Sequence, residues 1–178
     1  QGLGNTLLQQ QQFERAIDSF QQALDIQQNF SSAWYGLGKA YKAVGNYAKA
    51  LECYQCSAEI DCYQPALWLE ISEISDKETS LLAIQRALNL EPETVTFWNA
   101  LGNIQYGMKN YNDAIRSYYH ATSIQKDFGW PYANIALIHA QANQYDKAIL
   151  LLRESAQVFQ NDFEKAYAYY RLGAAHQQ

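Results

Sequence analysis

The sequence predicts an all-α fold of paired antiparallel helices, and three observations lead to this prediction. Chemically similar residues recur along the chain with a period of about 34 residues. Within each copy, large apolar residues lie at the three- and four-residue spacing of a helix with one buried face. Glycine and proline fall where this period requires turns and helix ends. Together these features indicate helical hairpins stacked in chain order.

The period is visible in both halves of the chain. A shift of about 34 residues brings together residues of the same size and character. The matched pairs include Gly4 with Gly38, Ala16 with Ala50, Phe20 with Tyr54, Leu101 with Ile135 and Tyr111 with Tyr145. Because such a period marks a repeat protein, each copy is expected to be one supersecondary unit that packs only on its neighbours.

Turn and breaker residues agree with this arrangement. Gly45 and Gly107 are predicted to lie in turns between helices, where a positive φ strains glycine little. Pro65 and Pro131 are expected at helix starts, and Pro92 after a helix end. No proline then interrupts a predicted helix.

The repeated residues match a known signature. The clearest copies read Trp34-x2-Leu37-Gly38-x2-Tyr41 followed by Ala50-x3-Tyr54, and Trp98-x2-Leu101-Gly102 followed by Ala114-x3-Tyr118. Over essentially its whole length the chain resembles the tetratricopeptide repeat (TPR) family. The resemblance implies a right-handed superhelical α-solenoid of antiparallel helix pairs. It also implies that Gly38, Ala50 and Ser57 lie where the two helices of a pair cross closely.

We expect one TPR array over residues 1–178, belonging to a longer protein. The expected repeats are about 1–30 (partial), 31–64, 65–94 (shortened), 95–128, 129–165, and a first helix alone at 166–178. Four residues are missing within Pro65 to Thr94, which predicts a shorter turn near Ser75 to Thr79 and truncated helices on both sides. Three extra residues between Ala136 and Gly173 predict a longer connection near Asn161 to Glu164.

Composition excludes several classes of partner. The formal net charge is -5, and the lysines and arginines are scattered, so neither nucleic acid nor an anionic membrane is an expected partner. No apolar run approaches the roughly 20 residues that span a bilayer. The three cysteines, Cys53, Cys56 and Cys62, form no regular disulfide framework. A reducing, cytoplasmic location is expected.

Residues that could carry chemistry are given structural roles by the repeat. Cys53-x2-Cys56 falls inside a second helix without a matching pair of ligands, and His139 and His176 occupy the signature's tyrosine position in the core. His120 is expected at the surface. Glu70 and Glu73 share one helix face, but no nucleophile, phosphate loop or metal motif accompanies them. We expect no enzyme active site, metal or cofactor in this segment.

The TPR resemblance places a ligand groove along the first helix of each pair. The groove residues that it implies are Tyr35, Lys39, Lys42, Leu69, Glu70, Glu73, Asn99, Asn103, Tyr106, Trp130, Asn134, Leu137, Tyr167, Tyr170 and Arg171. Aromatic rings next to amides and arginine are typical of binding hot spots; the alternative is that these rings pack on the adjacent helix. Asn103, Asn134 and Arg171 also match three positions of a clamp for a C-terminal carboxylate, whereas Asn99 and Tyr167 stand where that clamp has lysines.

These observations predict a scaffold that binds a protein or peptide. Two alternatives stay open at this point. The array could be an architectural spacer that associates with itself through its ends, or it could be a regulatory or substrate-recruiting arm of an enzyme whose catalytic domain lies elsewhere.

Overall fold

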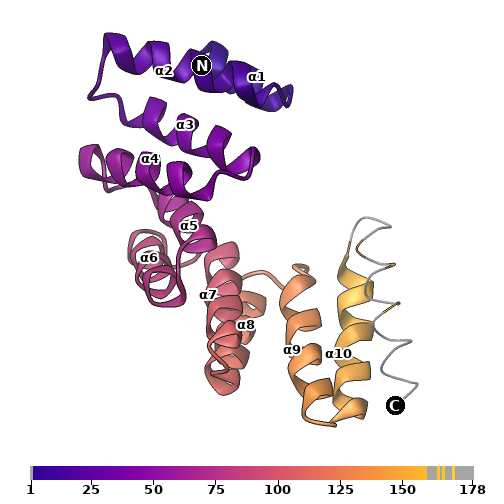
Figure 1. The fold of residues 1–178 in the computed structure, drawn as a ribbon. Helices are drawn as coiled ribbons and strands as arrows, with labels where there is room; N and C mark the ends of the chain where they lie inside the picture. The colour runs from indigo at the N-terminus through magenta and orange to yellow at the C-terminus, as the bar shows by residue number, and fades with distance from the viewer. Residues whose placement is uncertain (1, 160–163, 165, 167–169, 171–178) are drawn as a thin grey trace. The chain divides into compact units, whose positions relative to one another are not determined.

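The computed structural model describes residues 2–159, 164, 166 and 170. Ten helices account for most of the described residues up to Val158, and the rest lie in turns and connections, so the fold is all-α as predicted (Figure 1). The chain divides into two compact units, Gln1–Leu90 and Glu91–Gln178. The first, the N-terminal unit, contains α1 (Leu3–Gln9), α2 (Phe13–Ile26), α3 (Ser31–Ala43), α4 (Tyr47–Ile60), α5 (Pro65–Ile74) and α6 (Lys77–Leu90). The second, the C-terminal unit, contains α7 (Val95–Gly107), α8 (Tyr111–Ile124), α9 (Trp130–Gln141) and α10 (Tyr145–Val158).

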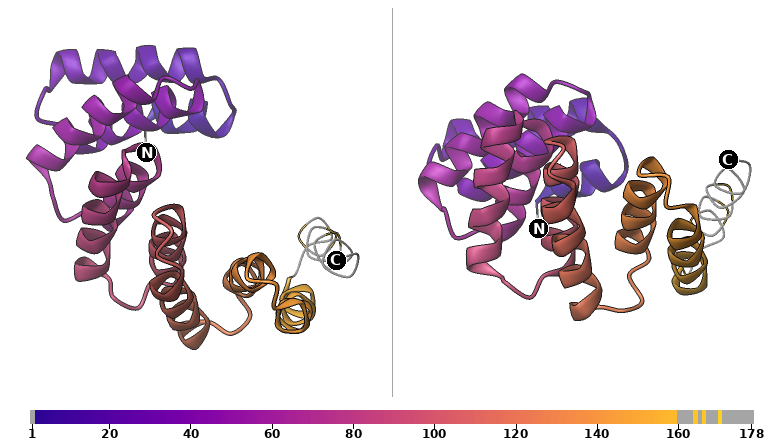
Figure 2. Two further views of the ribbon diagram at one scale, coloured as in Figure 1. Left: turned by 60° about the horizontal axis from the view of Figure 1, so that its bottom comes forward. Right: turned by 90° about the horizontal axis from the view of Figure 1, so that it is seen from below.

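Within each unit the helices pack as hairpins in chain order. The pairs are α1 with α2, α3 with α4 and α5 with α6 in the N-terminal unit, and α7 with α8 and α9 with α10 in the C-terminal unit (Figures 1 and 2). The first helices of successive pairs also meet, α1 with α3 and α7 with α9. This sequential pairing is the arrangement that the period predicted.

Close helix crossings depend on glycine, as the signature implied. A Cβ atom added to Gly38 would lie 2.4 Å from the ring of Tyr54, and one added to Gly102 would lie 2.4 Å from the ring of Tyr118. Both tyrosine rings are fully buried, so they have little room to move aside. The ring of each second helix therefore fills the space that a missing side chain leaves on the first helix.

Four of the five hairpin turns share one backbone conformation, and the shortened α5–α6 turn does not. Gly45 has a φ of 78°. Gln11, Lys109 and Asn143 occupy the equivalent turn positions in three other hairpins, with φ values of 58°, 64° and 58°. The predicted turn role of Gly107 was wrong, because α7 continues through Gly107 and the left-handed residue is Lys109.

The shortened repeat loses length on one side only. α5 has 10 residues where α3 and α7 have 13, but α6 keeps the full 14. The prediction that both helices would be truncated was therefore wrong for α6. Asp76 explains the difference, because its carboxylate accepts hydrogen bonds from the backbone N–H groups of Glu78 and Thr79 and caps α6 at its first turn. The hydrogen bonds from Thr79 also lower the pKa of Asp76.

Proline and tryptophan anchor the first helices. Pro65 opens α5, Pro131 lies in the first turn of α9, and Pro92 follows α6, which confirms all three expected positions. Each signature tryptophan donates its indole N–H to a carbonyl six residues earlier in the chain. These bonds join Trp34 to Gln28 (2.9 Å), Trp68 to Cys62 (2.9 Å) and Trp98 to Pro92 (2.7 Å). Each bond ties a first helix to the connection that precedes it.

Candidate functional site

The candidate site is the surface formed by the first helix of each pair, described separately for the two units. In the N-terminal unit α1, α3 and α5 supply it, and we call this the N-terminal face, defined by Tyr35, Lys39, Lys42, Glu70 and Glu73. In the C-terminal unit α7 and α9 supply it, and we call this the C-terminal face, defined by Asn99, Asn103, Tyr106, Asn134 and Gln141.

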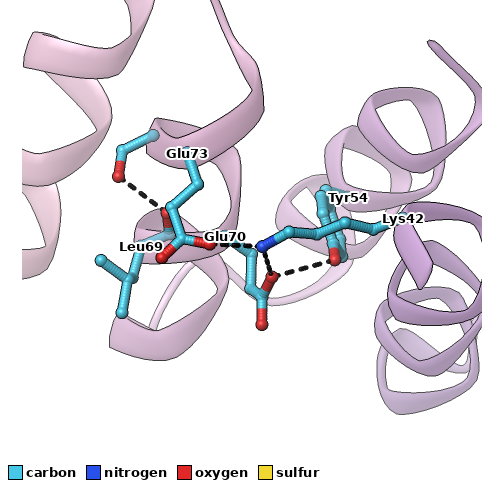
Figure 3. A network of polar contacts seen from close by, with 6 residues as sticks. Lys42, Tyr54, Leu69, Glu70 and Glu73 are labelled. Carbon is cyan, nitrogen blue, oxygen red and sulfur yellow. Dashed lines mark hydrogen bonds and ion pairs between the residues drawn. The ribbon is translucent and has the colours of Figure 1, made fainter. Parts of the chain in front are cut away.

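An ion network joins two helices of the N-terminal face. The ammonium of Lys42 on α3 lies 2.6 Å from a carboxylate oxygen of Glu70 on α5 and also contacts Glu73 on the same helix (Figure 3). The hydroxyl of Tyr54 donates a hydrogen bond to Glu70 at 3.3 Å. Glu70 is 19% exposed and Lys42 25% exposed, so solvent screens this pair only in part. The network therefore links the second and third repeats through side chains of α3, α4 and α5.

The surroundings change the ionisation of the groups in this network. Burial acts to lower the pKa of Lys42, but its hydrogen bonds to Glu70 and Glu73 outweigh burial and raise that pKa. Burial, and next the charge of Glu70, raise the pKa of Tyr35 to about 12. The same two causes raise the pKa of Tyr54. At neutral pH the lysine is thus charged and both phenols carry their protons.

The N-terminal unit also has a pocket of about 610 Å³ between α1 and α3. Its lining includes two residues of the predicted groove, Tyr35 and Lys39, and also Asn5, Leu8 and Gln9 of α1, which were not among the predicted site residues. The signal for them was present in the sequence. A shift of about 34 residues carries Lys39 onto Asn5 and Lys42 onto Leu8, so the same groove positions recur in the partial first repeat.

The C-terminal face carries amides in place of charges. The side-chain N–H of Asn134 on α9 donates to Asn99 at 3.3 Å and to Asn103 at 3.1 Å, both on α7. The buried Tyr118 donates its hydroxyl hydrogen to Asn103 at 2.8 Å. These bonds bring three predicted site residues into one asparagine group. Tyr118 supports this group from the buried side through its bond to Asn103.

Tyr106, a predicted groove residue, is bonded on the C-terminal face to Gln141, which was not predicted. Gln141, the last residue of α9, donates its side-chain N–H to the Tyr106 hydroxyl at 2.6 Å. Gln141 stands one repeat after Gly107, which directly follows the predicted groove residue Tyr106. The signal that could have identified Gln141 was therefore in the sequence.

Other predicted groove residues lie apart from these groups. The Trp130 ring packs edge-on against Phe159 with 5.1 Å between ring centroids, and its indole N–H donates to Glu164 at 3.2 Å. Leu69 and Leu137 are half-buried. Tyr170 is 74% exposed, whereas Tyr167 and Arg171 lie outside the described residues. The three-residue match to a carboxylate clamp therefore stays a prediction.

The cysteines lie where the repeat placed them. Cys53 is buried and Cys56 half-buried on α4, while Cys62 is exposed in the following connection. Burial raises the pKa of Cys53 to about 12 and also raises that of Cys56. Both thiols are therefore protonated at neutral pH, the opposite of what a redox-active pair requires. Among the residues that the structure describes, no cluster of three or more His, Cys, Asp or Glu side chains could hold a metal ion.

Two of the histidines can be placed. The predicted core burial of His139 was wrong: the ring is half-buried near the end of α9, with Nδ1 2.8 Å from the side-chain oxygen of Gln144 in the following turn. His120 is exposed as predicted, and its ring stacks on Trp98 at 3.9 Å between centroids. His176 lies outside the described residues.

Comparison with known proteins identifies the repeats. Models of the TPR repeat and the tetratricopeptide repeat match residues 4–45, 31–61 and 95–128, which together make up more than half of the chain. The chain belongs to the tetratricopeptide repeat family. Among the described residues, no helix is both long enough and apolar enough to cross a membrane.

Two curated TPR relatives are longer than this chain. The TPR repeat-containing protein YpiA of Bacillus subtilis (strain 168) is 24% identical over 177 residues, covering 96% of this chain and 38% of the relative. Anaphase-promoting complex subunit 6 of Dictyostelium discoideum is 24% identical over 111 residues, covering 60% of this chain and 13% of the relative. The chain thus spans less than two fifths of the length of either relative.

Solved TPR structures share the fold. A crystal structure of MamA matches with a TM-score of 0.80 at 22% identity, covering 89% of this chain and 95% of that one. PilF of Pseudomonas aeruginosa matches with 0.80 at 18% identity, covering 98% and 82%. YrrB, described as a TPR protein with an unusual peptide-binding site, matches with 0.74 at 17% identity, covering 94% and 88%. At these identities the likeness concerns the fold alone.

Proposed function

We propose that this TPR array binds an extended segment of another protein along the first helices of its repeats. TPR proteins mediate protein–protein interactions, and the proposal adds the surface that does so here. The observation that carries it is the asparagine group of the C-terminal face, in which Asn134 bonds to both Asn99 and Asn103.

Asparagine amides suit a peptide backbone because each offers both donors and an acceptor. Asn103 is exposed, and Asn99 and Asn134 are half-buried, so their remaining donors and acceptors are open to a ligand. The bond from Tyr118 fixes Asn103 before any ligand arrives. Such preorganisation lowers the entropy that binding costs. A main-chain ligand can thus find pairs of hydrogen bonds already oriented on a rigid helix face.

A peptide-display selection on the purified chain tests this proposal. Peptides should be enriched, and their affinity should fall about tenfold or more in the double variant Asn103→Ala/Asn134→Ala, because two hydrogen-bonding amides are lost. Asn112→Ala is the matched control, since Asn112 is an exposed asparagine on the second helix α8. Circular dichroism would check that each variant keeps its helices. Failure to enrich any peptide, or equal binding by the double variant and the wild type, would overturn the proposal.

A further inference from the structure

The pocket between α1 and α3 has a composition unlike the rest of the N-terminal face. Leu8, Phe13 and Ala43 give it an apolar part, and the amides of Asn5 and Gln9 stand at its α1 side. Neither of these two exposed amide side chains forms a hydrogen bond to another residue of the described chain. The pocket therefore offers unoccupied hydrogen-bonding groups next to apolar surface.

Lys39 is the one charged residue in the lining of this pocket. It is exposed and forms no ion pair with any described residue, whereas its helix neighbour Lys42 is engaged by two carboxylates. The lining of the pocket thus carries one positive charge and no negative one, in a chain whose formal net charge is -5. A ligand group of negative charge would complement it.

The position of the Lys39 ammonium is constrained by an aromatic ring. Its Nζ lies 5.5 Å from the centroid of the Tyr35 ring, a cation–π distance. Tyr35 is half-buried, and its ring lies 5.9 Å from that of the fully buried Tyr54. Since the Tyr35 ring beneath it packs against the buried Tyr54, the ammonium is held beside the pocket more firmly than a free lysine would be.

We propose that this pocket takes a segment of a partner protein in which an aspartate or glutamate stands next to an apolar side chain. The carboxylate pairs with Lys39, the apolar side chain lies on Leu8 and Ala43, and the amides of Asn5 and Gln9 bond to the ligand backbone. This inference rests on the proposed function, and it specifies the chemistry of the ligand on the N-terminal face.

A second groove of the N-terminal unit provides an internal comparison. It lies among α2, α3 and α4, and there Lys49 sits 5.2 Å from the centroid of the Tyr41 ring. The lining of that groove also contains Asp25 and Glu52. Its lysine is therefore offset by two carboxylates, and the groove does not favour an acidic ligand.

The test uses the peptides selected on the wild-type chain and their sequence preferences. Aspartate or glutamate beside an aliphatic or aromatic residue should be enriched among the selected peptides that bind in the α1–α3 pocket. Selection on Lys39→Glu should lose this enrichment and gain lysine or arginine at the same place. Lys49→Glu is the matched control, because it makes the same charge change at another lysine–tyrosine pair. It should leave the acidic preference intact.

A binding cycle with one selected peptide then isolates the contact. Replacing the peptide carboxylate by the corresponding amide should weaken binding to the wild type by about fivefold, as expected for a partly exposed ion pair. The same replacement should have less than about a twofold effect on Lys39→Ala. Raising the salt concentration should weaken the binding of the acidic peptide and leave the binding of its amide version unchanged.

The outcomes separate this inference from the proposed function. Enrichment that reverses in Lys39→Glu and persists in Lys49→Glu supports the acidic ligand. Peptides that bind without acidic preference, or a preference that Lys39→Glu leaves unchanged, overturn the inference while the array remains a peptide binder. A chain that enriches no peptide overturns both.

Discussion

Tyr54 and Tyr118 occupy equivalent positions in the two units, yet they end in different surroundings. Each ring is fully buried against a glycine of the preceding helix, Gly38 in one case and Gly102 in the other. Each hydroxyl points to the candidate binding face. Tyr54 donates to a carboxylate, Glu70 of the next repeat, whereas Tyr118 donates to an amide, Asn103.

The different acceptors of the two hydroxyls indicate which part of a TPR repeat is fixed by packing. The ring end of the tyrosine must fill a space of set size, because close-packed interiors tolerate little change in volume. The hydroxyl end needs only an acceptor, which can be charged or neutral. The two faces have accordingly become an ion network in the N-terminal unit and an amide group in the C-terminal unit on the same scaffold.

Adding a methyl group under each tyrosine should have the largest effect and should show whether the two cores are equivalent. Gly38→Ala and Gly102→Ala place a Cβ 2.4 Å from a buried ring. Overpacking of this kind costs about 1–3 kcal/mol, against which alanine's helix propensity returns at most about 1 kcal/mol. We expect both variants to be destabilised by similar amounts in urea unfolding.

Gly107→Ala is the control within α7. A Cβ added there would meet no atom within 4 Å apart from its chain neighbours and the backbone of its own helix, and its φ is not in the left-handed region. Alanine should therefore stabilise the unit by about 0.5 kcal/mol. Equal effects of Gly102→Ala and Gly107→Ala would contradict the packing explanation.

The hairpin turns should give the next largest effect. Gly45 and Lys109 share a left-handed conformation that costs a non-glycine residue about 1–2 kcal/mol. Gly45→Lys should therefore cost about 1 kcal/mol. The reverse change, Lys109→Gly, should stabilise by about 0.5 kcal/mol, because glycine's greater freedom in the unfolded chain offsets part of the relief. Thermal unfolding of the two variants checks the pair, and changes of the same sign would contradict the shared turn geometry.

These turns also mark a limit of sequence reasoning. Glycine predicts a left-handed turn only when glycine is present, and in three of the four turns of this kind the position holds Gln11, Lys109 or Asn143. The turn was therefore predicted at Gly107, two residues before Lys109. The period of 34 residues was the better guide, because it carries Gly45 back onto Gln11 and Lys109 onto Asn143. Repeat register would thus have located the turn at Lys109, where glycine identity pointed to Gly107.

The candidate site was predictable in position but not in its contacts. The family pattern named Lys42, Glu70, Asn103 and Asn134 as groove residues, and the structure brings them together in pairs. No spacing rule stated that Lys42 would reach across to α5, because that contact depends on how two repeats pack. Trp130 illustrates the same limit, since its ring turns to Phe159 and its indole N–H to Glu164.

Salt should distinguish the two faces. Lys42→Met leaves Glu70 and Glu73 without their shared cation, and we expect a loss of about 0.5–1 kcal/mol at low ionic strength that shrinks as salt is added. Asn134→Ala removes neutral hydrogen bonds, so its cost of about 0.5 kcal/mol should not change with salt. Urea unfolding at two salt concentrations provides the measurement. An equal salt dependence for both variants would show that the faces do not differ electrostatically.

The smallest effect on stability at neutral pH is expected at Tyr35, because its phenol carries its proton there in both the folded and the unfolded chain. Burial, followed by the charge of Glu70, raises the pKa of this phenol to about 12, above the ordinary value of 10.0. A group whose pKa is raised by folding contributes its full stability below the unfolded value and loses it as the pH rises through the folded value. Between about pH 10 and 12 the unfolded chain releases the Tyr35 proton first, so stability falls in that window.

Tyr35→Phe cannot ionise and should therefore lose less stability than the wild type across this window, while differing little from it at neutral pH. Tyr118, whose pKa burial also raises, contributes equally to both chains and cancels in the difference. Tyr54 does not cancel fully, because after burial and Glu70 the charge of Tyr35 is a minor cause of its raised pKa, and this contribution is counted with the effect of Tyr35. Tyr63→Phe is the control, since that ring is 79% exposed. Urea unfolding at a series of alkaline pH values gives the comparison. If Tyr35→Phe and Tyr63→Phe follow the same curve, the Tyr35 phenol is not buried within reach of the Glu70 charge, and the support beneath Lys39 is weaker than the geometry indicates.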